Sequence, residues 1–145
     1  MIKISHLDHL VLTVKDIDKT VDFYTKVLGM EKEIFKGTRV ALKFGNQKIN
    51  LHLLGSEFEP KAFNVKDGSA DLCFIINTPL NEAKNHIESL GVKIEEGIVS
   101  RTGAMGEIES IYLRDPDKNL IELSNYKSKE NLLLFKTSFH RDKTY

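Results

Sequence analysis

One order of hydrophobic patterns occurs twice in this chain, and that repeat constrains its fold more than any other feature. Residues 7–14 (LDHLVLTV) are apolar and β-branched enough for a buried strand. Apolar residues then recur at helical spacing, and Gly29 stands where a C-terminal glycine ends a helix. Residues 30–36, 39–44 and 48–54 have the composition of strands. The first half therefore predicts one strand, one helix and three further strands.

The same order restarts after the polar segment 55–69. Residues 71–77 (DLCFIIN) are typical of a strand, and residues 80–90 carry a second helical stripe that Gly91 closes. Three more strands are expected at 92–99, 108–114 and 120–124.

The two halves also share a register. Adding 62 to the numbers of Leu28 and Gly29 gives Leu90 and Gly91. The last strands of the two halves are instead offset by 70 residues. The extra residues of the second half are therefore expected in a loop at 99–107. We therefore expect one domain over residues 1–126, with modules at 7–54 and 70–126. The tail over 127–145 is charged except for LLLF at 132–135.

Composition excludes several classes of partner. Lys plus Arg and Asp plus Glu each number 21, so the chain lacks the basic surplus that binds nucleic acid or anionic membranes. The single cysteine, Cys73, excludes an internal disulfide, is expected in the core, and fits a reducing compartment. The first residues lack the apolar region of a signal peptide, so we expect a cytoplasmic protein.

Four polar residues stand out at the ends of this repeat. His9 and Asp71 open the first strands of the two halves, while His52 and Glu122 lie in the last strands. A glutamate in the apolar run KNLIELSNY is costly unless its charge is compensated. Two imidazoles and one or two carboxylates suit zinc, nickel, iron, cobalt or manganese and leave open positions for substrate. The four residues together predict a metal site.

Each of these residues, taken singly, has an ordinary structural explanation. A histidine on a strand is more often hydrogen-bonded within the fold than a metal ligand, and a strand glutamate more often reaches solvent at a sheet edge. Only the combination at repeat-related positions favours a metal.

At these residues the chain resembles the vicinal-oxygen-chelate superfamily, the group of glyoxalases, fosfomycin-resistance proteins and extradiol dioxygenases. The resemblance covers residues 7 to about 126 and rests on LDHLVLTV, DFYTKVLGM, INLH and YLRDPDKNLIEL. KFGNQKINLH and GSADLCFI look closer still to the glyoxalase-domain-containing protein 5 type. It implies an α+β fold of two βαβββ modules whose curled mixed sheets enclose a metal-binding cavity.

Carried over residue by residue, the resemblance implies His9, His52, Asp71 and Glu122 as ligands of a divalent metal (Ni, Zn, Co, Mn or Fe). Many glyoxalases have the order His, Glu, His, Glu, whereas this chain has His, His, Asp, Glu. The implied reaction is that of a lyase or isomerase acting on an α-hydroxycarbonyl or thiol adduct through a metal-stabilised enediolate. Glu122 is the implied catalytic base, glutathione or another thiol the implied co-substrate, and a homodimer the implied assembly.

Other readings stay open. Two histidines and a glutamate also form the facial triad of ferrous dioxygenases. Fosfomycin-type chemistry needs cations, for which Arg39, Arg101 and Arg114 are candidates, although solvated surface arginines are the ordinary explanation. A metal-free, drug-sequestering protein is a third reading. The segment RTGAMG (101–106) is read as a mobile substrate loop or an ordinary turn.

Overall fold

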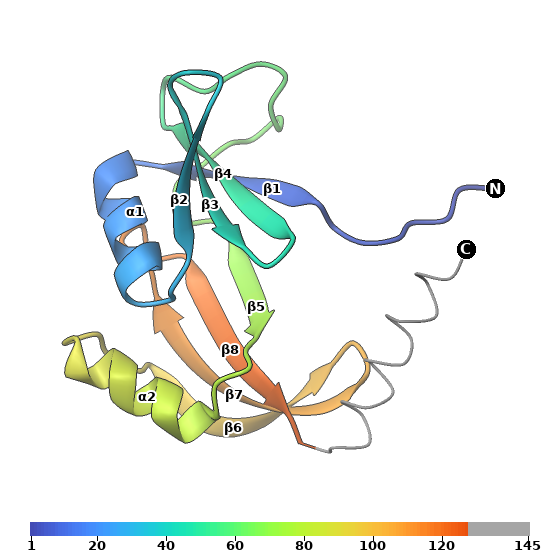
Figure 1. The fold of residues 1–145 in the computed structure, drawn as a ribbon, viewed down its shortest axis with the longest axis vertical. Helices are drawn as coiled ribbons and strands as arrows, with labels where there is room; N and C mark the ends of the chain where they lie inside the picture. Colours follow the sequence, from blue (N-terminus) through green and yellow to red (C-terminus); the bar gives the residue numbers. More distant parts are fainter. Residues whose placement is uncertain (128–145) are drawn as a thin grey trace. The chain divides into compact units, whose positions relative to one another are not determined.

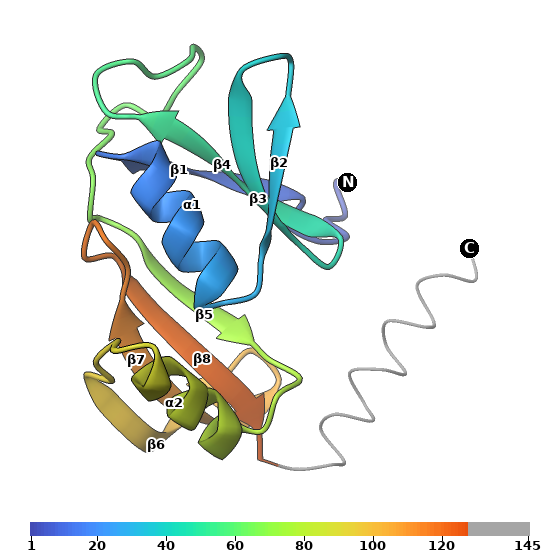
Figure 2. The same ribbon diagram turned by 60° about the vertical axis from the view of Figure 1, so that its left-hand side comes forward.

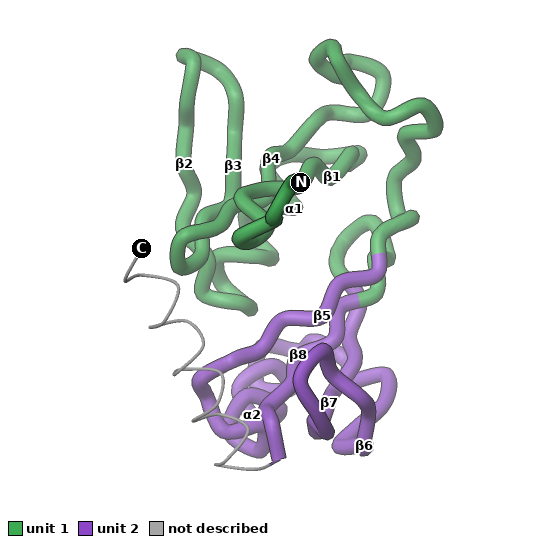
Figure 3. The backbone as a smooth tube through the Cα atoms, turned by 90° about the vertical axis from the view of Figure 1, so that its right-hand side faces the viewer, with its two compact units in different colours: residues 1–70, 115–120 green, residues 71–114, 121–145 purple. Residues whose placement is uncertain are grey.

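A computed structural model describes residues 1–127 of the chain; the apolar run at 132–135 lies outside the described residues. The chain divides into two compact units (Figure 3). Unit 1 comprises residues 1–70 with 115–120, and unit 2 comprises residues 71–114 with 121–127 of the described chain. No helix of the described part is long and apolar enough to cross a membrane.

Unit 1 contains one helix and one four-stranded sheet (Figure 1). Its elements are β1 (His9–Val14), α1 (Ile17–Lys26), β2 (Glu31–Phe35), β3 (Arg39–Phe44) and β4 (Gln47–Leu53). The strand order is β1-β4-β3-β2, in which β1 and β4 are parallel and the other neighbours antiparallel.

Unit 2 repeats this plan. Its elements are β5 (Asp71–Ile75), α2 (Leu80–Ser89), β6 (Glu96–Gly103), β7 (Gly106–Arg114) and β8 (Leu120–Tyr126). The strand order β5-β8-β7-β6 matches that of unit 1, with the last strand again beside the first. The predicted α+β class with two repeated strand–helix–three-strand modules is therefore confirmed.

The two helices begin differently. The side chain of Asp16 caps α1 by accepting a hydrogen bond from the backbone nitrogen of Lys19 at 2.9 Å. Helix α2 follows Pro79, which offers no side-chain cap. Its first backbone nitrogen, that of Leu80, donates instead to Oδ1 of Asn125 at 2.9 Å. A residue 45 positions away in the sequence thus performs the capping that no local pattern could predict.

Each helix covers one face of its own sheet (Figure 2). In unit 1 the buried side chains of Leu12, Val14, Ile49 and Leu51 alternate with Thr13, Asn50 and His52, which point to the opposite face. In unit 2 the residues Ile111, Leu113, Ile121 and Leu123 alternate in the same way with Ser110, Tyr112, Glu122 and Ser124. Each module therefore has an apolar face under its helix and a second face that carries the polar residues.

The prediction for residues 92–107 was wrong. Strand β6 begins at Glu96, and it stays paired with β7 as far as the pair Gly103–Gly106. The supposed loop at 99–107 is thus the end of a tight hairpin, and of the two readings of 101–106 the ordinary turn is the correct one. Strand β6 lies at the edge of its sheet, so its exposed polar side chains gave it the composition of a loop.

The loop between β7 and β8 is organised around one buried carboxylate, that of Asp115. Its Oδ2 accepts hydrogen bonds from the Tyr24 hydroxyl at 2.7 Å and from Nδ2 of Asn119 at 2.8 Å. Its Oδ1 accepts from the backbone nitrogens of Asp117 and Asn119, both at 2.9 Å. Four donors thus satisfy one carboxylate, and the signature DPDKN is primarily a structural element of unit 1.

Removing the Tyr24 hydroxyl tests this arrangement. Burial, followed by the negative charge of Asp115, raises the pKa of Tyr24 far above its usual value, so the hydroxyl stays a donor at all ordinary pH. Tyr24→Phe is expected to lower the free energy of unfolding by about 2 kcal/mol, because a hydrogen bond to a buried charge is lost. Urea unfolding measures this difference.

Tyr126→Phe is the matched control. Within residues 1–127 the Tyr126 hydroxyl accepts only a long hydrogen bond, 3.3 Å from the nitrogen of Met105, at an exposed hairpin. Its loss is expected to cost less than about 0.5 kcal/mol. Equal effects of the two substitutions would contradict the role given to Asp115.

Candidate functional site

His9 lies at the start of β1 and is exposed. Its Nδ1 is 2.7 Å from Oδ2 of Asp8, and this hydrogen bond lowers the pKa of the Asp8 carboxyl. A carboxylate on one ring nitrogen is the usual companion of a metal-binding histidine, because it fixes the tautomer and leaves the other nitrogen as the donor. The chemistry of His9 therefore fits the predicted role.

His52 lies on the same face of the sheet but is buried, with 8% of its surface exposed. Burial lowers the pKa of its imidazole, as does the positive charge of Arg39, while Glu57 opposes them. The ring is therefore neutral at physiological pH, the form that a metal ligand needs. Its Nδ1 has no hydrogen-bond partner within residues 1–127.

The two histidines are not adjacent. His9 pairs in register with Lys48, whereas His52 pairs with Thr13, so four register positions separate them. At about 3.3 Å per residue, their Cα atoms are roughly 13 Å apart along the strands. Unit 1 does not bring them together.

Glu122 is half-buried on β8, and serines explain how its carboxylate is accommodated there. The Ser110 hydroxyl on β7 donates to Oε2 of Glu122 at 2.6 Å, and Oγ of Ser124 lies 3.5 Å from the same oxygen. Ser110 itself is fully buried. The glutamate is thus held in place by hydrogen bonds from its own sheet.

The polar contacts continue on both sides of Glu122. Tyr112 is hydrogen-bonded to Glu122 and accepts from Nε of Arg101 at 3.0 Å. Burial raises the pKa of the Tyr112 phenol, although Arg101 opposes the shift, so this hydroxyl keeps its proton at neutral pH. On the other side, Ser110 lies 2.7 Å from Ser124.

Ser124 in turn lies 3.4 Å from Sγ of Cys73 on β5. One row of polar groups therefore crosses all four strands of this sheet, from β6 to β5. Cys73 is exposed, so its expected place in the core was wrong: it lies on the polar face, which an apolar neighbourhood in the sequence conceals. Asp71, two residues earlier and exposed, shares that face.

The four predicted ligands are therefore distributed evenly, with His9 and His52 in unit 1 and Asp71 and Glu122 in unit 2. Over the described residues, no three His, Cys, Asp or Glu side chains are gathered closely enough to hold a metal ion. His9 and Asp71 do hold matching positions, because each is the first residue of its strand. His52 and Glu122 do not, since they are the sixth residue of β4 and the third of β8.

Sequence reasoning missed Ser110 and Tyr112. Both interrupt the apolar run IESIYL at alternate positions, which places them on one face of β7. This alternation could have indicated a polar face on β7. Its connection to Glu122 follows only from the pairing of β7 with β8.

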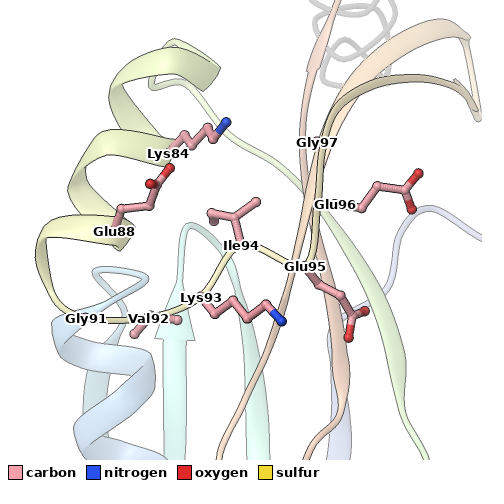
Figure 4. A pocket seen from close by; sticks show the side chains of 9 residues that line it. All are labelled: Lys84, Glu88, Gly91, Val92, Lys93, Ile94, Glu95, Glu96 and Gly97. Carbon is pink, nitrogen blue, oxygen red and sulfur yellow. The ribbon is translucent and has the colours of Figure 1, made fainter.

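Each unit has a hollow of its own. In unit 1 a cavity of about 380 Å³ is bordered by Val11, Thr13 and His52 of the sheet and by Pro60, Lys61, Ala62 and Val65 of the loop after β4. In unit 2 a hollow of about 640 Å³ lies between α2 and the start of β6 (Figure 4). Its charged side chains carry opposing signs, with Lys84 and Lys93 against Glu88, Glu95 and Glu96, and none of the predicted site residues borders it.

Comparisons with known proteins agree with this architecture. The profile of the Glyoxalase/Bleomycin resistance protein/Dioxygenase superfamily matches residues 6–123. Virulence protein STM3117 of Salmonella typhimurium is 58% identical over 123 residues, which cover 85% of each chain. Glyoxalase domain-containing protein RDO1 of Mycosarcoma maydis is 55% identical over 126 residues, 87% of this chain and 71% of the relative.

A solved structure shows the same fold. The integron cassette protein VCH_CASS1, from the mobile metagenome of V. cholerae, is 64% identical, with a TM-score of 0.86 over 88% of this chain and 99% of its own.

The thiol of Cys73 reports on the charge of Glu122. Partial desolvation of the sulfur raises the pKa of Cys73, and the carboxylates of Glu122 and Asp71 raise this pKa further, whereas the hydrogen bond with Ser124 lowers it. The pH midpoint of iodoacetamide alkylation, followed by mass spectrometry, is expected above that of a free cysteine. Glu122→Gln is expected to lower this midpoint, because it removes a negative charge.

Glu82→Gln, which removes an exposed carboxylate on α2, is expected to leave the midpoint unchanged. If Glu122→Gln did not move it either, the polar row described above would be wrong.

Proposed function

Because the chain belongs to the glyoxalase/bleomycin resistance protein/dioxygenase superfamily, we propose that it is a metal-dependent lyase or isomerase of glyoxalase type. Its substrate would be an α-hydroxycarbonyl compound or the adduct of a thiol, such as glutathione, with an α-ketoaldehyde. Glu122 would remove the proton next to the carbonyl and return it to the neighbouring carbon. The observation that carries this proposal is the hydrogen-bonded carboxylate of Glu122 between the apolar residues Ile121 and Leu123 of β8.

The surroundings of Glu122 support its role as a base. A hydrogen bond from Ser110 to one carboxylate oxygen fixes the orientation of the group, and Ser110 is buried, so it cannot turn away to solvent. Tyr112 keeps its proton and is itself held by Arg101. A structural glutamate at a sheet edge would need none of these partners, since water would solvate it. Strand β8 lies inside the sheet, between β5 and β7.

The metal ligands proposed are His9, His52, Asp71 and Glu122, although His9 and His52 do not meet within unit 1. The donor chemistry fits: His9 is backed by Asp8, and His52 is neutral with an unpartnered ring nitrogen. When bound, a divalent metal would supply a Lewis acid that stabilises negative charge on the substrate oxygens. Asp71 has the shorter reach of the two carboxylates. The expected homodimer and cytoplasmic location also stay predictions.

The names of the two relatives described above do not identify a reaction, and the family name itself covers glyoxalases, drug-resistance proteins and dioxygenases. A protein that only sequesters a ligand would not need a base held by Ser110. We therefore prefer proton transfer over simple binding. Oxygen insertion would use the same histidines and glutamate with iron, so the experiment must separate these two reactions.

Hydron exchange tests the proposal without requiring the physiological product. The native protein, loaded in turn with nickel, zinc, cobalt or manganese, would be mixed in D₂O with hemithioacetals of α-ketoaldehydes. Proton NMR is expected to show exchange or transfer of the α-proton. Glu122→Gln is expected to slow this step by at least about 10²-fold, the usual contribution of a general base.

Glu109→Gln is the matched control, because it makes the same change of charge at an exposed position of the neighbouring strand β7. It is expected to behave as wild type. Unchanged exchange in Glu122→Gln would remove Glu122 from the mechanism. Absence of exchange in every metal form, with oxygen consumed by the iron form, would establish the dioxygenase reading instead.

A further inference from the structure

The cavity of unit 1 lies on the face of the sheet opposite α1. Its floor is formed by Val11, Thr13 and His52, and its rim by the loop after β4. Most of the bordering side chains are apolar, including those of Pro60, Ala62 and Val65. A ligand with an apolar body suits such a lining.

One cation beside this cavity, Arg39, has no carboxylate partner among the residues that the structure describes. The guanidinium of Arg39 on β3 stacks on the ring of Phe58 at 3.9 Å, and that ring meets the imidazole of His52 edge-on, with 5.4 Å between centroids. Arg39 also acts on His52 electrostatically, so its charge is felt at the cavity floor. Within residues 1–127 no acidic side chain forms an ion pair with Arg39.

The acidic residues of the loop are already engaged elsewhere. Lys61 lies 3.9 Å from Glu57 and 3.6 Å from Glu59, so it draws both carboxylates to itself. The other two arginines of the described chain, Arg101 and Arg114, are paired with Glu96 and Glu95. Arg39 thus differs from the other described arginines in having no ion-pair partner within residues 1–127. Because its guanidinium stacks on a ring through its face, the N–H groups at its edge remain available for a planar, bidentate partner such as a carboxylate.

Two buried polar atoms on β4 point to the same ligand. Oδ1 of Asn50 and Nδ1 of His52 have no hydrogen-bond partner within the described chain, and both residues lie on the face of the sheet that borders the cavity. Leaving a buried polar atom without a hydrogen-bond partner destabilises the protein. In the metal-free protein, a bound molecule with hydroxyl or amide groups near its charged end would satisfy both atoms; with a metal bound, Nδ1 of His52 would ligate the metal and Oδ1 of Asn50 would remain for the ligand.

We propose that this cavity binds a small molecule with an apolar body and a carboxylate head, and that Arg39 recognises the carboxylate. The proposal rests on the proposed function in that it names the substrate class of the enzyme. It adds a specificity-determining residue, Arg39, together with Phe58, which holds the guanidinium in place. Its test requires neither a metal nor turnover.

The test is a titration of the chelator-treated, ¹⁵N-labelled full chain with 4-methylpentanoate, followed by heteronuclear NMR. Saturable shifts are expected at the amides of Val11, Thr13 and Ala62. The neutral isostere 4-methylpentanamide is expected to bind at least about tenfold more weakly, because a hydrogen-bonded charge pair is lost. This comparison needs no variant, so it holds even if substitutions of Arg39 disturb folding.

Arg39→Gln, with folding checked by the dispersion of its own spectrum, is expected to bind the carboxylate about ten- to a hundredfold more weakly and to lose the preference over the amide. Lys43→Gln is the control, because it removes one exposed positive charge from the same strand. It is expected to bind as wild type.

Equal binding of the carboxylate and the amide, equal weakening by Lys43→Gln, or no saturable shift with the carboxylate would each overturn the proposal. None of these results depends on hydron exchange, so failure of the proposed reaction and failure of carboxylate recognition are separate outcomes.

Discussion

The buried carboxylate of Asp115 fixes where the last strand begins, and the position of Glu122 depends on it. Asp115 gathers four hydrogen bonds from Tyr24, Asp117 and Asn119. Oδ1 of Asn119 then accepts from the nitrogen of Ala70, whose carbonyl accepts from Leu120 at 3.1 Å. Glu122 lies two residues after Leu120 in the same strand. A slip of one residue in β8 would turn it from Ser110 toward the apolar face under α2, so this loop determines which face the glutamate occupies.

In both modules, the residues that stabilise the fold and the residues that can react or bind lie on opposite faces of the sheet. One face of each sheet is apolar and covered by a helix, and the opposite face carries the groups that can react or bind. In unit 1 those groups are neutral His52 and cationic Arg39 beside a cavity, and in unit 2 they are the carboxylate of Glu122 and its hydrogen-bond donors. The repeated fold thus supports two different polar faces, which explains why the modules match in topology more closely than in site residues.

Much of the fold could be predicted from the sequence, because both helices and most strands carry clear periodicity. Helix α1 has its cap, its apolar stripe and its terminal glycine within a short window of sequence. Strand β6 could not be predicted with correct bounds, since an edge strand carries polar residues and its pairing partner defines it.

The candidate site was predictable only in part, for a related reason. Glu122 was visible as an anomaly in an apolar run, whereas its partners Ser110 and Tyr112 become evident only when β7 lies beside β8. The predicted equivalence of His52 and Glu122 was wrong, because the two residues lie at different positions along their strands. A sequence offset of an even number of residues keeps a side chain on the same face of a strand, but it does not fix how far along the strand that side chain lies.

The measurement that tests the central claim most directly is the metal content of the native protein, purified without chelator or nickel resin and analysed by inductively coupled plasma mass spectrometry. We predict about one divalent ion per chain, lost in Glu122→Gln and in His9→Ala. A folded protein that takes up none of nickel, zinc, cobalt, manganese or iron, even when each is added, would contradict the account.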